Sequence, residues 1–127
     1  MTQEDKQLLL IDLCARLPYG VIIHNEEGYE GHLNSISQNI FGIELGVNVT
    51  AMHRVDFQLD TCKPYLRPMS SMTEEEENEY RAINCYEGLF PRNEDALDYI
   101  LSHHFDHRGL IEKGLALEAP EGMYKMQ

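Results

Sequence analysis

Two consecutive runs of alternating residues occupy the middle of the chain, between positions 41 and 60. The apolar residues of both runs fall on odd positions: Phe41, Ile43, Leu45, Val47, Val49, Val55, Phe57 and Leu59. Because successive side chains of a strand point to opposite faces, each run predicts a half-buried strand with one apolar face. The linker of residues 50–54 is short enough for a hairpin, so the two strands are expected to pair.

A helix is predicted ahead of these strands. Thr2 can cap its first turn, and Pro18 ends it. On a helical wheel Asp5, Asp12 and Arg16 share a narrow polar edge, while apolar residues cover most of the remaining surface. We therefore expect this helix to be largely buried.

Two more strands are predicted between the helix and the alternating runs. Residues 19–24 are rich in β-branched side chains, residues 25–28 have turn chemistry, and residues 31–38 read as a more polar return strand. Its polarity predicts a place at the edge of the sheet. Residues 62–72 contain Pro64 and Pro68, which argue against both a helix and a central strand and favour an extended connector.

The next helix is predicted to begin in a glutamate-rich segment. Thr73 and Glu76 form a capping box for it, and Ser71 with Glu74 makes an equally good box two residues earlier. The helix should run to about Ile83 and be mostly solvated. Residues 84–91 are ambiguous, with a short strand over residues 85–90 as one interpretation.

Asn93 is expected to cap a third helix, which Gly109 ends or bends. Its inner stripe consists of Leu97, Ile100, Leu101 and His104. The order of the elements predicts an α+β fold, in which an antiparallel sheet of two hairpins is packed by the N-terminal helix and two further helices form the C-terminal half. Residues 1–127 should form one domain, with residues 118–127 loosely held.

The charge of the chain is negative and unevenly distributed. Against 10 Lys and Arg stand 22 Asp and Glu, for a formal net charge of −12, which argues against binding duplex nucleic acid through its phosphates. Residues 73–98 alone hold nine acidic and two basic side chains. We expect either a solubilising surface or a face that binds a basic partner, formed by Glu74, Glu75, Glu77, Glu79, Glu94, Asp95 and Asp98.

The cysteine pattern points to a reducing compartment. The 3 cysteines are an odd number without a C-x-x-C pair, so neither a disulfide framework nor a zinc ribbon is indicated. The first residues lack the basic start of a signal peptide, and the apolar run that follows is too interrupted to span a membrane. A cytoplasmic protein without a cofactor is expected.

Two weaker site hypotheses come from basic and histidine residues. His103 and His107 would share one helix face and could ligate zinc if the third helix continued through His107. Lys63 and Arg67 precede a helix N-terminus and could bind an anionic ligand, although the first-turn glutamates oppose this and pairing with neighbouring carboxylates is the simpler interpretation.

Three stretches, residues 12–21, 63–73 and 105–117, resemble a group of short uncharacterised proteins from gut Bacteroidales bacteria and their phages and mobile elements. The resemblance covers most of the chain and implies no established activity. Together with the acidic segment, it leads us to expect a non-enzymatic binding protein that acts as an inhibitor or adaptor on a host protein with a basic surface. The alternatives are a metal-dependent hydrolase using His103 and His107, and a nucleotide-type ligand binder using Lys63 and Arg67.

Overall fold

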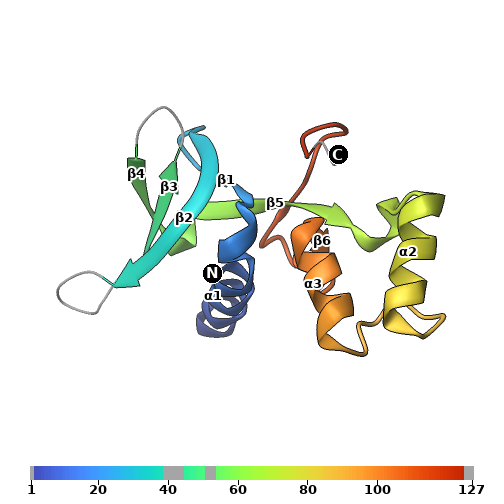
Figure 1. Ribbon diagram of the computed structural model, residues 1–127. Helices are drawn as coiled ribbons and strands as arrows, with labels where there is room; N and C mark the ends of the chain where they lie inside the picture. The colour runs from blue at the N-terminus through green and yellow to red at the C-terminus, as the bar shows by residue number, and fades with distance from the viewer. Residues whose placement is uncertain (1, 39–44, 51–53, 125–127) are drawn as a thin grey trace.

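The computed structural model describes residues 2–38, 45–50 and 54–124 and has an α+β fold (Figure 1). Five strands form the main sheet in the order β4-β3-β2-β1-β5. Their bounds are β1 (Ile22–Asn25), β2 (Glu30–Gln38), β3 (Leu45–Thr50), β4 (Arg54–Gln58) and β5 (Cys62–Pro68). Two short strands, β6 (Phe105–Asp106) and β7 (Leu117–Glu118), run parallel to β5. The predicted fold class is confirmed, with a sheet that is mixed rather than purely antiparallel.

Strands β1 to β4 form an antiparallel meander. Both predicted hairpins, β1 with β2 and β3 with β4, are present. The first part of the predicted strand 41–49 and most of the linker lie outside the described residues. The second alternating run is shorter than predicted, because β4 ends at Gln58 and a 3₁₀ turn (Leu59–Thr61) leads into β5.

The prediction that residues 31–38 form an edge strand is wrong, because β2 pairs with β1 on one side and with β3 on the other. Its register shifts between Leu33 and Ser35, which is the signature of a β-bulge. The extra residue lets Leu33 and Ile36, three positions apart, both pack against the core. A bulge of this kind breaks strict alternation, so the pattern alone underestimated how central the strand is.

The interpretation of residues 62–68 as a connector is also wrong, because β5 lies between β1 on one side and β6 and β7 on the other. Antiparallel hydrogen bonds alternate along a ladder, and the Glu26 N–H donates to the Thr61 carbonyl oxygen at 3.1 Å. Because bonded and non-bonded pairs alternate from that bond along the two strands, the pair of Pro64 and Ile23 falls on a non-bonded position. The N–H that proline lacks is therefore not needed for the β1–β5 ladder.

Helix α1 (Gln3–Arg16) covers one face of the sheet, and Thr2 caps it as predicted. Its Leu9 and Leu13 are fully buried in a core cluster with residues of the sheet and the C-terminal segment: Val21, Ile23, Leu33, Leu59, Cys62, Leu66, Leu110, Leu115 and Ala116. The expected polar edge is not a solvated one, because Asp12 and Arg16 are both fully buried.

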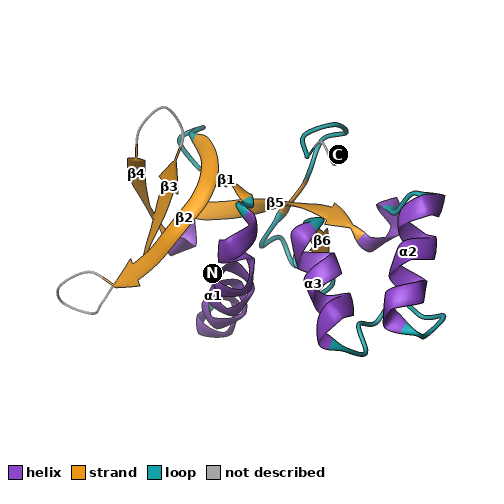
Figure 2. Cartoon of the chain, in the orientation of Figure 1, coloured by secondary structure: helices purple, strands orange, loops and turns teal. Residues whose placement is uncertain are grey.

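Helices α2 (Glu74–Asn84) and α3 (Glu94–Ser102) pack side by side and run in opposite directions (Figure 1). The Thr73–Glu76 capping box forms, and the Ser71 hydroxyl instead donates to the Pro68 carbonyl. A second core cluster holds the pair together and consists of Tyr80, Ala96, Tyr99, Ile100 and Phe105. In the view of Figure 2, α1 and α3 lie below β5, and the end of the chain after β7 lies above it.

Two details of the C-terminal half differ from the predictions. Residues 85–90 form a turn and bends rather than a strand. Asn93 caps α3 as predicted, but the helix ends at Ser102 instead of near Gly109, because His104 adopts a left-handed backbone conformation with φ of 63°. His104 is therefore not part of a helical stripe.

Candidate binding surface

The helix pair separates the seven carboxylates of the predicted acidic face. Glu74 and Glu75 lie in the first turn of α2, whereas Glu94 and Asp95 lie in the first turn of α3. Because the two helices run in opposite directions, these turns lie at opposite ends of the pair (Figure 1). An 11-residue helix such as α2 is about 16 Å long, so the two groups cannot contact one ligand side chain together.

The other three carboxylates of that face have partners within the protein. The Arg81 guanidinium lies 2.5 Å from Glu77, on the exposed side of α2. The Tyr99 hydroxyl donates to Glu79 at 3.1 Å, and the Tyr19 hydroxyl reaches Asp98 at 3.4 Å. Burial, together with the Glu79 carboxylate, raises the pKa of the Tyr99 hydroxyl well above its usual value.

A groove of about 860 Å³ lies where α2 begins, between the 3₁₀ turn Met69–Ser71, the first turns of the helix and residues 118–124. Five carboxylates line it: Glu75, Glu76, Glu79, Glu118 and Glu121. Among its lining residues Arg67 is the single Lys or Arg. The structure therefore joins part of the predicted acidic face to two glutamates from the end of the chain.

Arg67 is half-buried and already has partners within the protein. Its Nη1 and Nη2 donate to the two carboxylate oxygens of Glu76 at 2.8 and 2.7 Å, and its guanidinium lies over the Phe105 ring at 4.3 Å. This guanidinium is the main reason that the pKa of Glu76 is lowered. A fork-to-fork pair of this kind fixes both side chains, so Arg67 locks β5 to α2 and the groove keeps its uncompensated negative charge.

Lys63 and Arg67, the residues of the predicted anion site, lie on the same strand but not next to each other. They lie four residues apart on β5, which corresponds to about 13 Å along a strand. Lys63 pairs in register with His24, far along the strand from the first turn of α2. The Arg67 guanidinium is already paired with Glu76, and the hypothesis of an anion site shared by these two residues stays a prediction.

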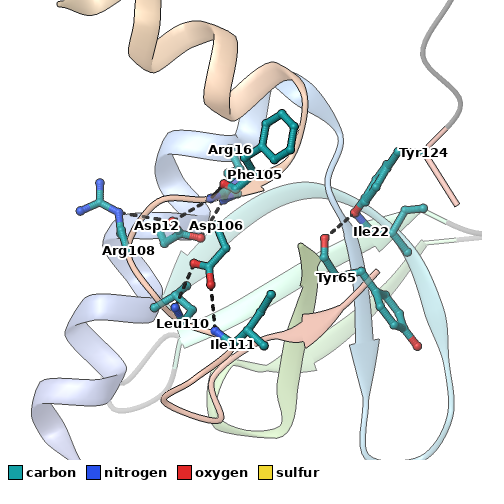
Figure 3. A network of polar contacts seen from close by, with 10 residues as sticks. All are labelled: Asp12, Arg16, Ile22, Tyr65, Phe105, Asp106, Arg108, Leu110, Ile111 and Tyr124. Atoms are coloured by element: carbon teal, nitrogen blue, oxygen red, sulfur yellow. Dashed lines mark hydrogen bonds and ion pairs between the residues drawn. The ribbon is translucent and has the colours of Figure 1, made fainter. Parts of the chain in front are cut away.

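Tyr124 fastens the C-terminal wall of the groove (Figure 3). Its hydroxyl accepts a hydrogen bond from the Ile22 N–H and donates one to the Tyr65 carbonyl, both at 2.8 Å. Ile22 and Tyr65 are the next residues along β1 and β5 after the last pair in register, Ile23 and Pro64. The Tyr124 hydroxyl therefore bridges the two strands where their direct pairing ends. The ring stacks on His104 at 3.8 Å, and burial raises the pKa of Tyr124 to about 12. Residues 118–124 are thereby held against the sheet.

His103 and His107 do not share a helix face, because α3 ends at Ser102, before both residues. The His103 ring stacks on Tyr99 at 4.0 Å, with Nδ1 2.8 Å from the Tyr99 carbonyl oxygen. His107 lies beyond β6, and burial lowers its pKa to about 4. Among residues 2–38, 45–50 and 54–124, no group of three or more metal-ligating side chains is placed to hold a metal ion.

A buried polar network joins α1 to the segment that follows α3, and sequence reasoning missed it (Figure 3). Arg16 pairs with Asp12 at 2.8 Å and donates to the Phe105 carbonyl at 2.7 Å. Arg108 Nε lies 3.3 Å from Asp12 without hydrogen-bond geometry, so this contact is purely ionic. Asp106 accepts the backbone N–H groups of residues 110 and 111 at 2.9 and 3.0 Å. The i, i+4 spacing of Asp12 and Arg16 was the available signal.

A second polar cluster crosses three strands on the more open side of the sheet. Glu30 accepts a hydrogen bond from the Tyr65 hydroxyl and lies 3.1 Å from His24 Nδ1. The bond to Glu30 raises the pKa of Tyr65 to about 12, and the same bond lowers the pKa of Glu30. These contacts tie β1, β2 and β5 together. They lie on an exposed strand surface rather than in a cavity.

Comparisons with protein families, with curated proteins and with solved structures found no match for this chain. Within the described ranges, no helix is both long and apolar enough to cross a membrane. The groove, its charge and its fastened wall are therefore the observations on which a function can be based.

Proposed function

We propose that this chain is a non-enzymatic binding protein that takes a basic segment of a protein partner into the acidic groove. The observation that carries the proposal is the arrangement of charge in a concave site. Five glutamates line the groove, and its single guanidinium already binds Glu76 through two hydrogen bonds. A lysine or arginine of a partner would enter a site in which four of the five glutamates have no Lys or Arg counterion among the lining residues.

The exposure of the glutamates suits this role. Glu75, Glu118 and Glu121 are exposed and come from two segments that lie on opposite sides of the groove. A concave surface of one sign concentrates the field and speeds the approach of an oppositely charged partner. Association should therefore weaken as salt rises, because the charges that steer it are screened over about 8 Å at physiological ionic strength.

The resemblance to proteins of phages and mobile elements supports a host protein as the partner. On this proposal the chain acts in the bacterial cytoplasm as an inhibitor or adaptor. The structure is compatible with a reducing compartment in one respect, since Cys14, Cys62 and Cys85 are all free thiols.

The test compares two variants with the same change in net charge. The groove variant replaces Glu75, Glu118 and Glu121 by Gln, and the control variant replaces three exposed glutamates away from the groove: Glu26, Glu27 and Glu112. The wild type captures the partner from the natural host, mass spectrometry identifies it, and the purified partner is then titrated with each variant at low salt.

The groove variant should bind at least about tenfold more weakly, which corresponds to about 1.4 kcal/mol shared by three charges. The control variant should bind within about twofold of the wild type, because exposed charges outside the contact act only through the screened field. Equal losses in both variants would mean that net charge, rather than the groove, attracts the partner.

A further inference from the structure

Exposed apolar residues gather at the end of α2 and in the loop that joins it to α3. This loop follows the last turn of α2 (Figure 1), whereas the groove lies at the first turns of the helix. Four large residues within eight positions are exposed: Ile83 at 37%, Tyr86 at 46%, Leu89 at 41% and Phe90 at 73%. Single exposed apolar residues are normal on soluble proteins, whereas a contiguous group of them marks an interaction site.

The protein holds this loop in place from inside. The buried Asn84 donates from Nδ2 to the Phe90 carbonyl at 2.9 Å and accepts the Arg92 N–H on Oδ1 at 2.7 Å. The fully buried Tyr80 donates its hydroxyl to the Leu89 carbonyl at 2.8 Å. The backbone of residues 89 and 90 is thus fixed by two core side chains, while the side chains of the same residues remain in solvent.

The Tyr86 ring lies against two residues of the same segment, Arg92 and Gly88. The Arg92 guanidinium lies over the ring at 4.7 Å. The ring also lies against Gly88, where an added Cβ would come within 2.4 Å of Tyr86 Cε1. Because glycine has no Cβ, the Tyr86 ring can pack against the loop backbone at this position.

We propose that Phe90 and its neighbours anchor this protein in an apolar pocket of a protein partner, with Lys or Arg around the pocket rim. An aromatic anchor on a rigid loop loses little conformational entropy on binding, which is the property of strong interface residues. Three carboxylates, Glu87, Glu94 and Asp95, lie in or next to the loop against one arginine, Arg92, so the local charge is negative. This charge favours a basic rim on the partner and opposes a second copy of the chain, which has a net charge of −12.

This surface is distinct from the groove and does not depend on the function proposed for it. The probe for the test is a display library of ankyrin-repeat domains with randomised concave surfaces, selected for binding to the wild-type protein. The test variant is Phe90→Ser. Two controls remove apolar groups that are exposed elsewhere, at Ile11 (54%) and Tyr29 (57%), by the same change to Ser.

Most selected domains should bind Phe90→Ser at least about tenfold more weakly than the wild type, keep their affinity for both controls, and show an excess of Lys and Arg around the selected pocket. Phe90→Ser should keep the thermal midpoint of the wild type, because the side chain is largely exposed. Selected domains that bind Phe90→Ser and the wild type equally would overturn the proposal, whether or not they respond to the groove variant.

Two alternative binding partners of the loop, a second copy of the chain and a lipid surface, are tested with the same proteins. Sedimentation at micromolar concentration should find a monomer for both the wild type and Phe90→Ser. Vesicles of phosphatidylcholine should not retain the wild type on flotation. A wild-type dimer that Phe90→Ser disrupts, or retention on vesicles that Phe90→Ser abolishes, would assign the loop to self-association or to a lipid surface instead and contradict the proposed partner.

Discussion

Replacing Asp12 by Asn should destabilise the protein strongly, because it leaves the Arg16 guanidinium buried without its counterion. Both side chains are fully buried, and two hydrogen bonds of 2.8 and 3.3 Å join them. Arg16 Nη1 is also buried and has no hydrogen-bond partner among the described residues. Breaking a buried pair from one side costs about 3 to 5 kcal/mol, a large part of the roughly 5 to 15 kcal/mol that stabilise a typical domain.

The matched control is Glu77→Gln. Glu77 and Arg81 have the same i, i+4 spacing on a helix, but their side chains are 37% and 47% exposed. An exposed pair of this type contributes about 0.3 to 0.5 kcal/mol. The two variants therefore differ in burial rather than in chemistry, and their difference isolates the cost of a buried unpaired charge.

Urea unfolding followed by circular dichroism provides the measurement. With a slope of about 1.5 kcal/mol per molar urea, Asp12→Asn should lower the unfolding midpoint by at least about 2 M, and Glu77→Gln by less than about 0.5 M. The double variant Asp12→Leu, Arg16→Met should recover part of the loss, since it removes both charges. A loss below about 1 kcal/mol for Asp12→Asn would show that Arg16 has other access to solvent or partners, and would refute the reasoning.

Three more predictions follow from the polar contacts of the C-terminal half and the core. Tyr124→Phe leaves the Ile22 N–H and the Tyr65 carbonyl without their bridge and should cost about 1 to 3 kcal/mol in urea unfolding, whereas no loss would mean that the hydroxyl is dispensable. Burial lowers the pKa of His104 to about 4, so the neutral His104 ring contributes fully to stability above about pH 6.5, and this contribution falls as pH drops towards 4. The free energy of unfolding should therefore depend less steeply on pH in His104→Asn than in the wild type. An unchanged slope would contradict this prediction. In the native protein two thiols should react quickly with a thiol reagent, and the buried Cys62 only on unfolding; three fast thiols would contradict its burial.

The parts of the fold that could be predicted from the sequence are those that depend on neighbours in the chain. The caps at Thr2, Thr73 and Asn93 form because each side chain bonds a backbone N–H three residues away. The hairpins follow from alternation and short linkers, which are also local.

The remaining features depend on contacts between distant segments. The central position of β5 is possible because Pro64 lies opposite β1 at a position where no backbone hydrogen bond is formed, and no local pattern specifies this register. The groove needs residues 67–76 and 118–124 to meet, and the bond of Tyr124 to the β1–β5 pair brings them together. The end of α3 is decided by the left-handed conformation of His104, a residue type in which this conformation is uncommon.

The buried Asp12–Arg16 pair illustrates a different limit. Its spacing is visible in the sequence, and on an isolated helix such a pair lies at the surface. Here the Phe105 carbonyl and Arg108, about ninety residues further on, close over it. Sequence spacing predicted the contact geometry and could not predict the burial.

The most direct test of the groove as a binding site is to map where a basic peptide binds. A hexapeptide of arginine and glycine in alternation is titrated into ¹⁵N-labelled wild type, and the backbone amide shifts are followed by NMR at low salt. The largest shifts should fall in residues 67–76 and 118–124, disappear in the groove variant and persist in the Glu26, Glu27 and Glu112 control. Shifts spread evenly over the acidic surface, or unchanged in the groove variant, would contradict the proposed site.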